Sequence, residues 1–136
     1  MYARIRAAGY GELQPAHIAL FGYPTIDGVR PTEIADRLLI TKQSVNDLLR
    51  QLEAAGYLKL RPDPADARAR LVTLTKSGKK LLEAVRAASW EVEREWASSI
   101  GEAKYRDFRD TLGRFVEGEG EVPTAERPEK TTRHRR

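Results

Sequence analysis

The stretch from Thr41 to Gly56 carries the most restrictive pattern in the sequence. Four apolar residues recur there at the i, i+3, i+4 and i+7 spacing of one helical face: Val45, Leu48, Leu49 and Leu52. Thr41 has a hydroxyl that can cap a helix N-terminus, and Gly56 is a typical helix stop. The pattern predicts an amphipathic helix with one buried face and one face left for solvent or a partner.

A shorter helical segment lies directly before this helix. Thr32 is its expected N-cap, the helix ends near Leu39, and its apolar face holds Ile34, Ala35 and Leu38. Further upstream, Pro15 suits the first turn of another helix, which ends before Pro24. Two short helices a few residues apart, the second longer and amphipathic, are typical of a helix-turn-helix.

Two segments with strand-like alternation follow the helix-turn-helix. Residues 57–61 and 70–74 alternate apolar and polar side chains, and Pro62 to Asp66 between them have the composition of a turn. A helix-turn-helix followed by a hairpin is a winged helix. Asp63 and Asp66 are expected to be structural and to pair with Arg68, which would fix the turn.

Two further helices are predicted after the hairpin. Thr75 is the expected cap of a helix that runs to about Ile100, with an apolar stripe of Leu81, Leu82, Val85, Ala88, Val92 and Trp96. Gly101 breaks it. The last helix carries Tyr105, Phe108, Leu112, Phe115 and Val116 on one face. This apolar surface exceeds what one small domain needs, so we expect a dimer interface at Tyr105, Phe108, Leu112 and Phe115.

The predicted fold class is therefore mainly α with a small β-hairpin wing (α+β), a winged helix-turn-helix plus a helical dimerisation region. Its expected parts are a short N-terminal helix (1–13), the winged helix-turn-helix DNA-binding domain (14–75), C-terminal dimerisation helices (76–117) and a disordered tail (118–136). The tail contains glycine and proline breaks and almost no large apolar residue, so it cannot bury enough surface to offset the entropy of ordering.

Composition narrows the function. The net charge of +4 and the pI near 9.5 favour a polyanionic partner, most often nucleic acid. The absence of cysteine excludes disulfides and thiol chemistry, and no Ser-His-Asp set, phosphate loop or HExxH motif is present. We therefore expect no enzyme, no cofactor and no metal. No apolar run approaches the roughly 18 residues of a membrane span, so we expect no membrane partner and a cytoplasmic protein, nucleoid-associated when bound.

The polar face of the helix after Thr41 has base-reading chemistry. Gln and Asn can grip adenine, Arg can grip guanine, and Asp or Ser can accept from cytosine; the residues are Gln43, Ser44, Asn46, Asp47 and Arg50. Thr41 and Lys42 at the helix start suit phosphate. Arg61, Arg68 and Arg70 around the turn suit the minor groove or its phosphates. A plain solvated face has the same composition, but the position between a helix-turn and a hairpin favours readout of double-stranded DNA.

The segment Asp63 to Gly78 resembles the wing signature of the MarR (multiple antibiotic resistance regulator) family. Thr32 to Leu38 and Gln51 to Leu58 resemble its helix-turn-helix, and the resemblance covers about residues 13–117. It implies a homodimeric bacterial transcription factor, a repressor that binds a near-palindromic operator and is released by a small ligand. By position, it places Lys42, Gln43, Ser44, Asn46 and Arg50 on the recognition helix and Arg68 on the wing.

Two features depart from that family pattern. Many relatives carry a basic residue where this chain has Asp47, so Asp47 is expected to orient Arg50 instead of contacting a base. The family also opens with a long dimerisation helix, whereas only Tyr2 to Ala8 precede Gly9 here.

An effector site is the least constrained expectation. Trp90 falls opposite the apolar stripe, where it packs on a partner chain or the first helix, lines a ligand cavity, or lies exposed over arginine stems. In the cavity alternative, His17 and Tyr23 supply polar contacts to a small aromatic effector. His17 by itself is typical of a hydrogen-bonded, semi-buried histidine and not of a catalytic base. The alternative function is a winged helix used for protein–protein or RNA contacts.

Overall fold

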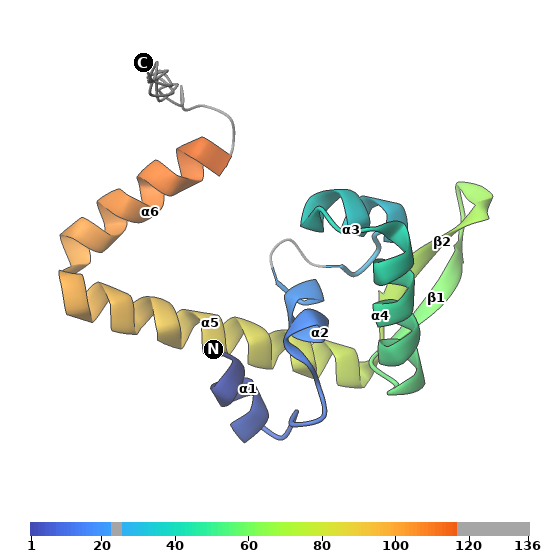
Figure 1. Ribbon diagram of the computed structural model, residues 1–136, viewed down its shortest axis with the longest axis horizontal. Helices are drawn as coiled ribbons and strands as arrows, with labels where there is room; N and C mark the ends of the chain where they lie inside the picture. The colour runs from blue at the N-terminus through green and yellow to red at the C-terminus, as the bar shows by residue number, and fades with distance from the viewer. Residues whose placement is uncertain (23–25, 117–136) are drawn as a thin grey trace, which may run out of the picture. The chain divides into compact units, whose positions relative to one another are not determined.

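The computed structural model describes residues 1–22 and 26–116 (Figure 1). In chain order its elements are α1 (Tyr2–Ala7), α2 (Pro15–Leu20), α3 (Pro31–Leu38), α4 (Lys42–Ala54), β1 (Leu58–Asp63), β2 (Asp66–Leu74), α5 (Lys76–Ile100) and α6 (Glu102–Val116). The chain forms two units, one ending at Arg94 and the other beginning at Glu95. The predicted class, mainly helical with one antiparallel hairpin, is confirmed. The tail predicted for 118–136 lies outside the described residues.

The helix-turn-helix consists of α3 and α4. Thr41 caps α4, because the backbone N–H of Ser44 donates to the Thr41 Oγ1 at 3.1 Å, and the left-handed Gly56 (φ 81°) follows its end. Both predictions are confirmed. The predicted cap at Thr32 is wrong: α3 begins at Pro31, with Arg30 as its N-cap. Proline has no N–H to satisfy and a helical φ, so the helix starts two residues earlier than predicted.

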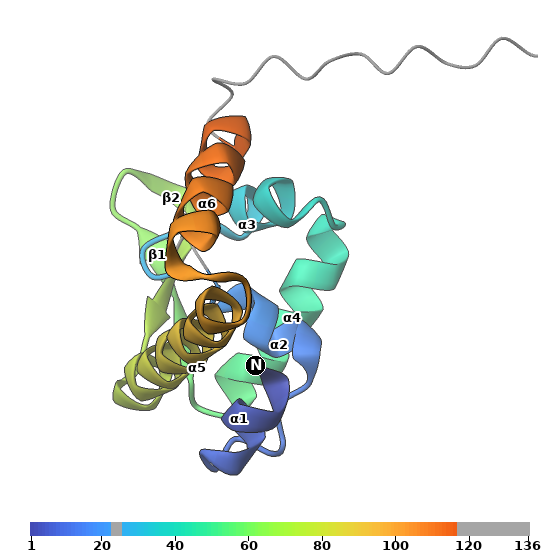
Figure 2. The same ribbon diagram turned by 90° about the vertical axis from the view of Figure 1, so that its left-hand side faces the viewer.

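The core of the first unit is built on the leucine face of α4. Val45, Leu49 and Leu52 are fully buried, and Leu48 is partly buried against the same cluster. They belong to one cluster with residues of α2, α3, the hairpin and α5: Ile18, Leu20, Ile34, Leu58, Val72 and Leu81. Figures 1 and 2 show α2 between α4 and the first part of α5. Each such side chain contributes about 1.5–3 kcal/mol by leaving water, so α4 is held rigidly.

The hairpin is longer than predicted. Pro62 and Asp63, expected in the turn, are the last residues of β1, and only Pro64 and Ala65 connect the strands. The register is irregular at the end of the hairpin, where Pro62 pairs with Arg70 but Asp63 pairs with Asp66. The backbone N–H of Ala65 donates to Asp63 Oδ1 at 2.8 Å. Proline is tolerated because β1 is an edge strand.

A connecting segment braces the base of the hairpin. The Gly28 N–H donates to the Val72 carbonyl at 2.8 Å, and the Val72 N–H donates to the Val29 carbonyl at 3.0 Å. The Leu74 N–H donates to Asp27 Oδ1 at 2.9 Å. Strand β2 therefore lies between β1 and the segment that leads into α3, which ties the hairpin to the helix-turn-helix.

Helix α5 starts at a tight junction with the hairpin. Thr75 caps it as predicted, since its Oγ1 accepts from the Gly78 N–H at 3.1 Å. A Cβ at Gly78 would lie 1.9 Å from the Tyr57 carbonyl oxygen, so only glycine fits. Leu81, Val85 and Ala88 are buried as expected.

Trp96 differs from its expected place in the buried stripe, because its side chain is 57% exposed. It lies beyond Arg94, where the first unit and its core end. In the second unit α6 has no buried residue, and Phe108 is 55% exposed. The apolar face of α6 is thus exposed in this chain.

The N-terminal residues pack on the first unit. Ile5 of α1 is fully buried, and the Tyr2 hydroxyl donates to the Leu13 carbonyl at 2.5 Å. Arg4 forms an ion pair with Glu91 of α5 at 2.9 Å. The short first helix is therefore an integral part of the winged-helix unit.

Candidate nucleic-acid interface

A basic groove opens between the start of α3, the start of α4 and the hairpin. Its volume is about 450 Å³, and it is lined by Arg30, Pro31, Thr32, Lys42, Asn46, Leu60, Arg68, Ala69 and Arg70. Four cations from three separate segments meet here. Lys42, Asn46, Arg68 and Arg70 were predicted site residues, and the fold brings them together.

Leu60 and Ala69 of the hairpin line the groove although neither was a predicted site residue. Three further lining residues were not predicted either: Arg30, Pro31 and Thr32. They precede or begin α3, and the pattern of this segment predicts only the start of a helix. The signal that was available is a basic residue directly before a helix N-terminus, which is a common phosphate-contact position.

The remaining predicted residues of α4 lie on its outer face. Gln43, Ser44 and Arg50 are exposed, and Asp47 is half-buried. The hydroxyls of Thr41 and Ser44 bond each other at 2.8 Å, so both are engaged in the helix cap. Gln43, Asn46 and Arg50 are left as the amide and guanidinium groups that α4 can offer to a partner.

The expectation that Asp47 orients Arg50 is confirmed. Nη2 of Arg50 donates to Oδ1 of Asp47 at 2.8 Å. An exposed pair at this spacing contributes only about 0.2–1 kcal/mol to stability. Its effect is to hold a long side chain in one direction at the surface of α4.

Arg61 is separated from the groove. Side chains alternate across a strand, and Leu60 lines the groove, so Arg61 lies on the opposite face of β1. It is exposed there, paired in register with Leu71. Its predicted contact with DNA would therefore be made from a different side of the wing than those of Arg68 and Arg70.

The expected pairing of Asp63 with Arg68 is wrong. Asp63 Oδ2 accepts from Nε and Nη2 of Arg30, at 2.8 and 2.5 Å, and Asp66 Oδ2 lies 3.9 Å from Nη1 of the same guanidinium. Only the backbone N–H of Arg68 contacts an acid, donating to Asp66 Oδ1 at 3.0 Å. The hydrogen bond from the Ala65 N–H and then that from Arg30 lower the pKa of Asp63 below its usual value. The Arg68 side chain is thus not committed to either acid.

The three residues predicted for an effector site differ in their surroundings. His17 is 5% exposed; its Nδ1 accepts from the Gln14 N–H at 3.1 Å, and its Nε2 lies 2.9 Å from Gln51 Oε1. Both ring nitrogens thus have partners inside the protein, as expected for a structural histidine. Trp90 is 60% exposed. Tyr23 lies outside the described residues.

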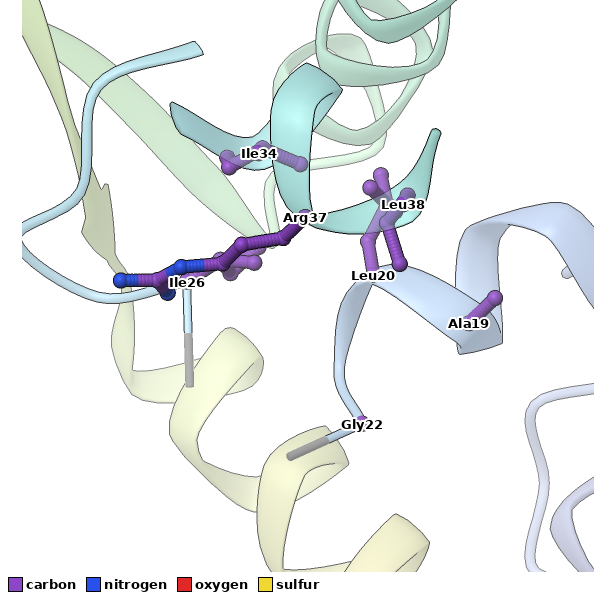
Figure 3. A pocket seen from close by; sticks show the side chains of 7 residues that line it. All are labelled: Ala19, Leu20, Gly22, Ile26, Ile34, Arg37 and Leu38. Atoms are coloured by element: carbon purple, nitrogen blue, oxygen red, sulfur yellow. The ribbon is translucent and has the colours of Figure 1, made fainter. Parts of the chain in front are cut away.

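A small cavity lies between α2 and α3 (Figure 3). Its volume is about 80 Å³, and it is lined by Ala19, Leu20, Gly22, Ile26, Ile34, Arg37 and Leu38. An apolar cavity that holds benzene has a volume of about 150 Å³. The cavity is therefore too small to enclose an aromatic effector.

The described residues, 1–22 and 26–116, also bear on other kinds of site. They contain no group of three or more His, Asp or Glu side chains arranged to hold a metal ion. None of their helices has the length and apolar content to cross a membrane.

The helix pair, the hairpin that follows it and the groove between them define a winged helix-turn-helix protein. The fold matches the crystal structure of MarR with a TM-score of 0.70, at 21% identity over 87% of this chain and 83% of that one. A sequence model of the MarR family matches residues 13–69 of this chain.

Two further relatives are informative. The chain is 28% identical over 109 residues to the transcriptional activatory protein BadR of Rhodopseudomonas palustris, which covers 79% of this chain and 61% of BadR. The chain thus spans about three fifths of that relative. The structure of an S. aureus MepR–DNA complex matches with a TM-score of 0.66, at 24% identity over 88% of each chain.

Proposed function

We propose that this chain is a transcriptional regulator that binds double-stranded DNA as a homodimer. The observation that carries the proposal is the basic groove, in which Lys42 of α4 and Arg68 and Arg70 of the wing converge. A cluster of cations beside a helix with an exposed amide and guanidinium face suits a phosphate backbone and the base edges next to it. MepR, which shares the fold, has been solved with DNA.

The proposed roles divide between affinity and sequence choice. Lys42, with Thr41 at the N-terminus of α4, holds phosphate, and Arg68 and Arg70 follow the backbone or the minor groove. Gln43, Asn46 and Arg50 read base edges in the major groove. Asp47 fixes the direction of Arg50, and Ser44 supports the cap that orients the start of α4.

The homodimer is proposed on the apolar face of α6. Tyr105 is partly buried and Phe108, Leu112 and Phe115 are exposed, although they share one helical face. Contiguous exposed apolar surface of this kind marks a protein interface. A two-fold axis would set two copies of α4 about 34 Å apart, one turn of the duplex, so the operator would be near-palindromic.

We further propose that the regulator represses transcription and that a small aromatic effector releases it from DNA. Repression follows if the operator overlaps a promoter; BadR, by contrast, is named an activatory protein. Trp90 offers an exposed aromatic ring to an effector, whereas His17 would first have to give up its bond to Gln51. A reporter gene behind the operator, assayed with and without the regulator, determines the direction.

Binding to DNA is tested by fluorescence anisotropy with the full chain. The probe is the intergenic duplex next to its own gene, and the competitors are a scrambled duplex and RNA of the same sequence. We expect the intergenic duplex to bind at least about 10³-fold more tightly than the scrambled one. Equal affinity for all three, or preference for RNA, would replace this proposal with the alternative of a winged helix for RNA or protein contacts.

A further inference from the structure

The wing is attached to the start of α3 by an ion pair whose carboxylate is nearly buried. Asp63, at the end of β1, is only 8% exposed, and both of its carboxylate oxygens are used. Oδ1 accepts from the Ala65 N–H at 2.8 Å inside the turn, and Oδ2 accepts from Nε and Nη2 of Arg30. One carboxylate thus connects the tip of the wing with the residue that caps α3.

Arg30 is itself held in place by the same sheet. It follows Gly28 and Val29, whose backbone groups bond the carbonyl and the N–H of Val72 in β2. The segment therefore supports the hairpin at its base through the backbone, and near its tip through the Arg30 side chain. Two points of attachment restrain the swing of a hairpin far more than one.

A negative charge at Asp63 is unfavourable for binding DNA. A structural role for Asp63 would explain why an acid lies at this place. An acid beside a groove lined by Lys42, Arg68 and Arg70 repels phosphate and cancels the charge of Arg30. All three nitrogens of the Arg30 guanidinium contact Asp63 or Asp66. Their N–H groups are therefore directed toward the protein.

We propose that Arg30 and Asp63 are positioning residues, whose ion pair holds the wing at the angle that lets Arg68 and Arg70 reach DNA. This inference rests on the proposed function, because its consequence is an affinity for DNA. The change in DNA affinity that it predicts is opposite to the change expected from simple electrostatics. Removal of a negative charge from the edge of the basic groove should weaken binding.

The first test is Asp63→Asn in the full chain. It keeps the size of the side chain and an oxygen for the Ala65 N–H, but it removes the charge that Arg30 pairs with. We expect the affinity for the specific duplex to fall by about fivefold or more, a typical coupling between linked sites. The control is Asp36→Asn, an exposed acid on α3 outside the groove lining, which should bind as tightly as the original protein or slightly more so.

The second test uses Arg30→Lys, which keeps the positive charge but loses the planar fork that contacts Asp63 with two nitrogens. If Arg30 simply contacted phosphate, Arg30→Lys would bind nearly normally and Asp63→Asn would bind more tightly. Either result would overturn the positioning role. We expect both variants to lose affinity, and the loss from Arg68→Ala to become smaller in the Asp63→Asn background.

Amide hydrogen exchange reports on the wing without DNA. In Asp63→Asn the amides of Arg68 and Ala69 should exchange faster, while those of Val45 and Leu49 in the core stay protected. Unchanged wing exchange would refute the inference even if DNA binding fell. If the original protein bound no duplex, the proposed function would fail, and faster exchange at the wing would still support the ion pair as the support of the hairpin.

Discussion

The guanidinium of Arg50 donates to the carboxylate of Asp47, one turn earlier on the exposed face of α4, at 2.8 Å. Because both side chains are at the surface, the pair adds little to stability. What it does is limit the directions in which Arg50 can point before DNA arrives, which lowers the entropy lost on binding. The pair also places an acid on a face that we propose contacts DNA.

Asp47→Ala should therefore lower sequence discrimination while raising general affinity. The loss of a negative charge favours any duplex, whereas the loss of orientation affects only the specific site. We expect the ratio of specific to random binding to fall by about twofold to fivefold, less than the 1–3 kcal/mol expected for Arg50→Ala. Competition titrations with specific and scrambled duplexes measure the ratio. A ratio equal to that of the original protein would show that Arg50 needs no such support.

Arg68→Ala and Arg61→Ala should differ, because the two arginines lie on opposite faces of the hairpin. Arg68 lines the basic groove, so its loss should weaken all duplexes similarly and reduce the slope of log affinity against log salt by about 1. Arg61 lies on the other face and should have a smaller effect on both quantities. A larger effect from Arg61→Ala would mean that the wing presents its other face to the duplex.

Local patterns predicted the elements well, and the reason is visible in the helix caps. Thr41 and Thr75 cap through side chains that bond an N–H three residues ahead, so their whole signal lies within one turn of sequence. The leucine face of α4 is likewise a periodic property of one segment. Such features depend on neighbours that the sequence shows directly.

Contacts between distant segments were not predictable in this way. Asp63 has two basic neighbours in sequence, Arg61 and Arg68, yet it pairs with Arg30, 33 residues away. The bonds of Val72 with Gly28 and Val29 and of Leu74 with Asp27 bring Arg30 to the wing, and no local pattern encodes these contacts. Trp96 shows the same limit: its helical period matches the stripe, but the core of the first unit ends before it.

Gly78→Ala should disrupt the junction between the hairpin and α5. The added Cβ would lie 1.9 Å from the backbone carbonyl oxygen of Tyr57, and a backbone atom cannot rotate away as a side chain can. We expect a loss of about 3 kcal/mol or more, at or above the upper range for overpacking. Urea unfolding measures it. The control is Gly113→Ala in α6, which meets no neighbouring atom and should be neutral or stabilising; equal behaviour of the two variants would contradict this account of the junction.

Leu39→Gly should stabilise the protein. Leu39 ends α3 in the left-handed conformation (φ 53°), which costs a residue with a Cβ roughly 1–2 kcal/mol. Its side chain is 92% exposed, so little burial is lost. The greater freedom of glycine in the unfolded chain offsets part of the gain, which leaves about 0.5–1 kcal/mol.

Thermal unfolding of Leu39→Gly and Leu39→Ala separates the two contributions. Alanine removes the exposed side chain but keeps the Cβ, and with it the backbone strain. We expect a higher midpoint for the glycine variant and no rise for the alanine variant. A rise for alanine as large as that for glycine would show that the exposed side chain, and not the backbone angle, is the source of the cost.

Phe108→Glu combined with Phe115→Glu should give a folded monomer with weak operator binding. No residue of α6 is buried in this chain, so the substitutions remove no core contact, but they place two charges in the proposed interface. A dimer that engages two half-sites binds far more tightly than one copy, because the second contact becomes intramolecular. Sedimentation velocity reports the mass, circular dichroism the fold, and anisotropy the affinity.

The matched control is Arg106→Glu on the polar side of α6, which changes the net charge by the same two units. A double variant that stays dimeric while the control behaves as the original protein would move the interface away from this face of α6.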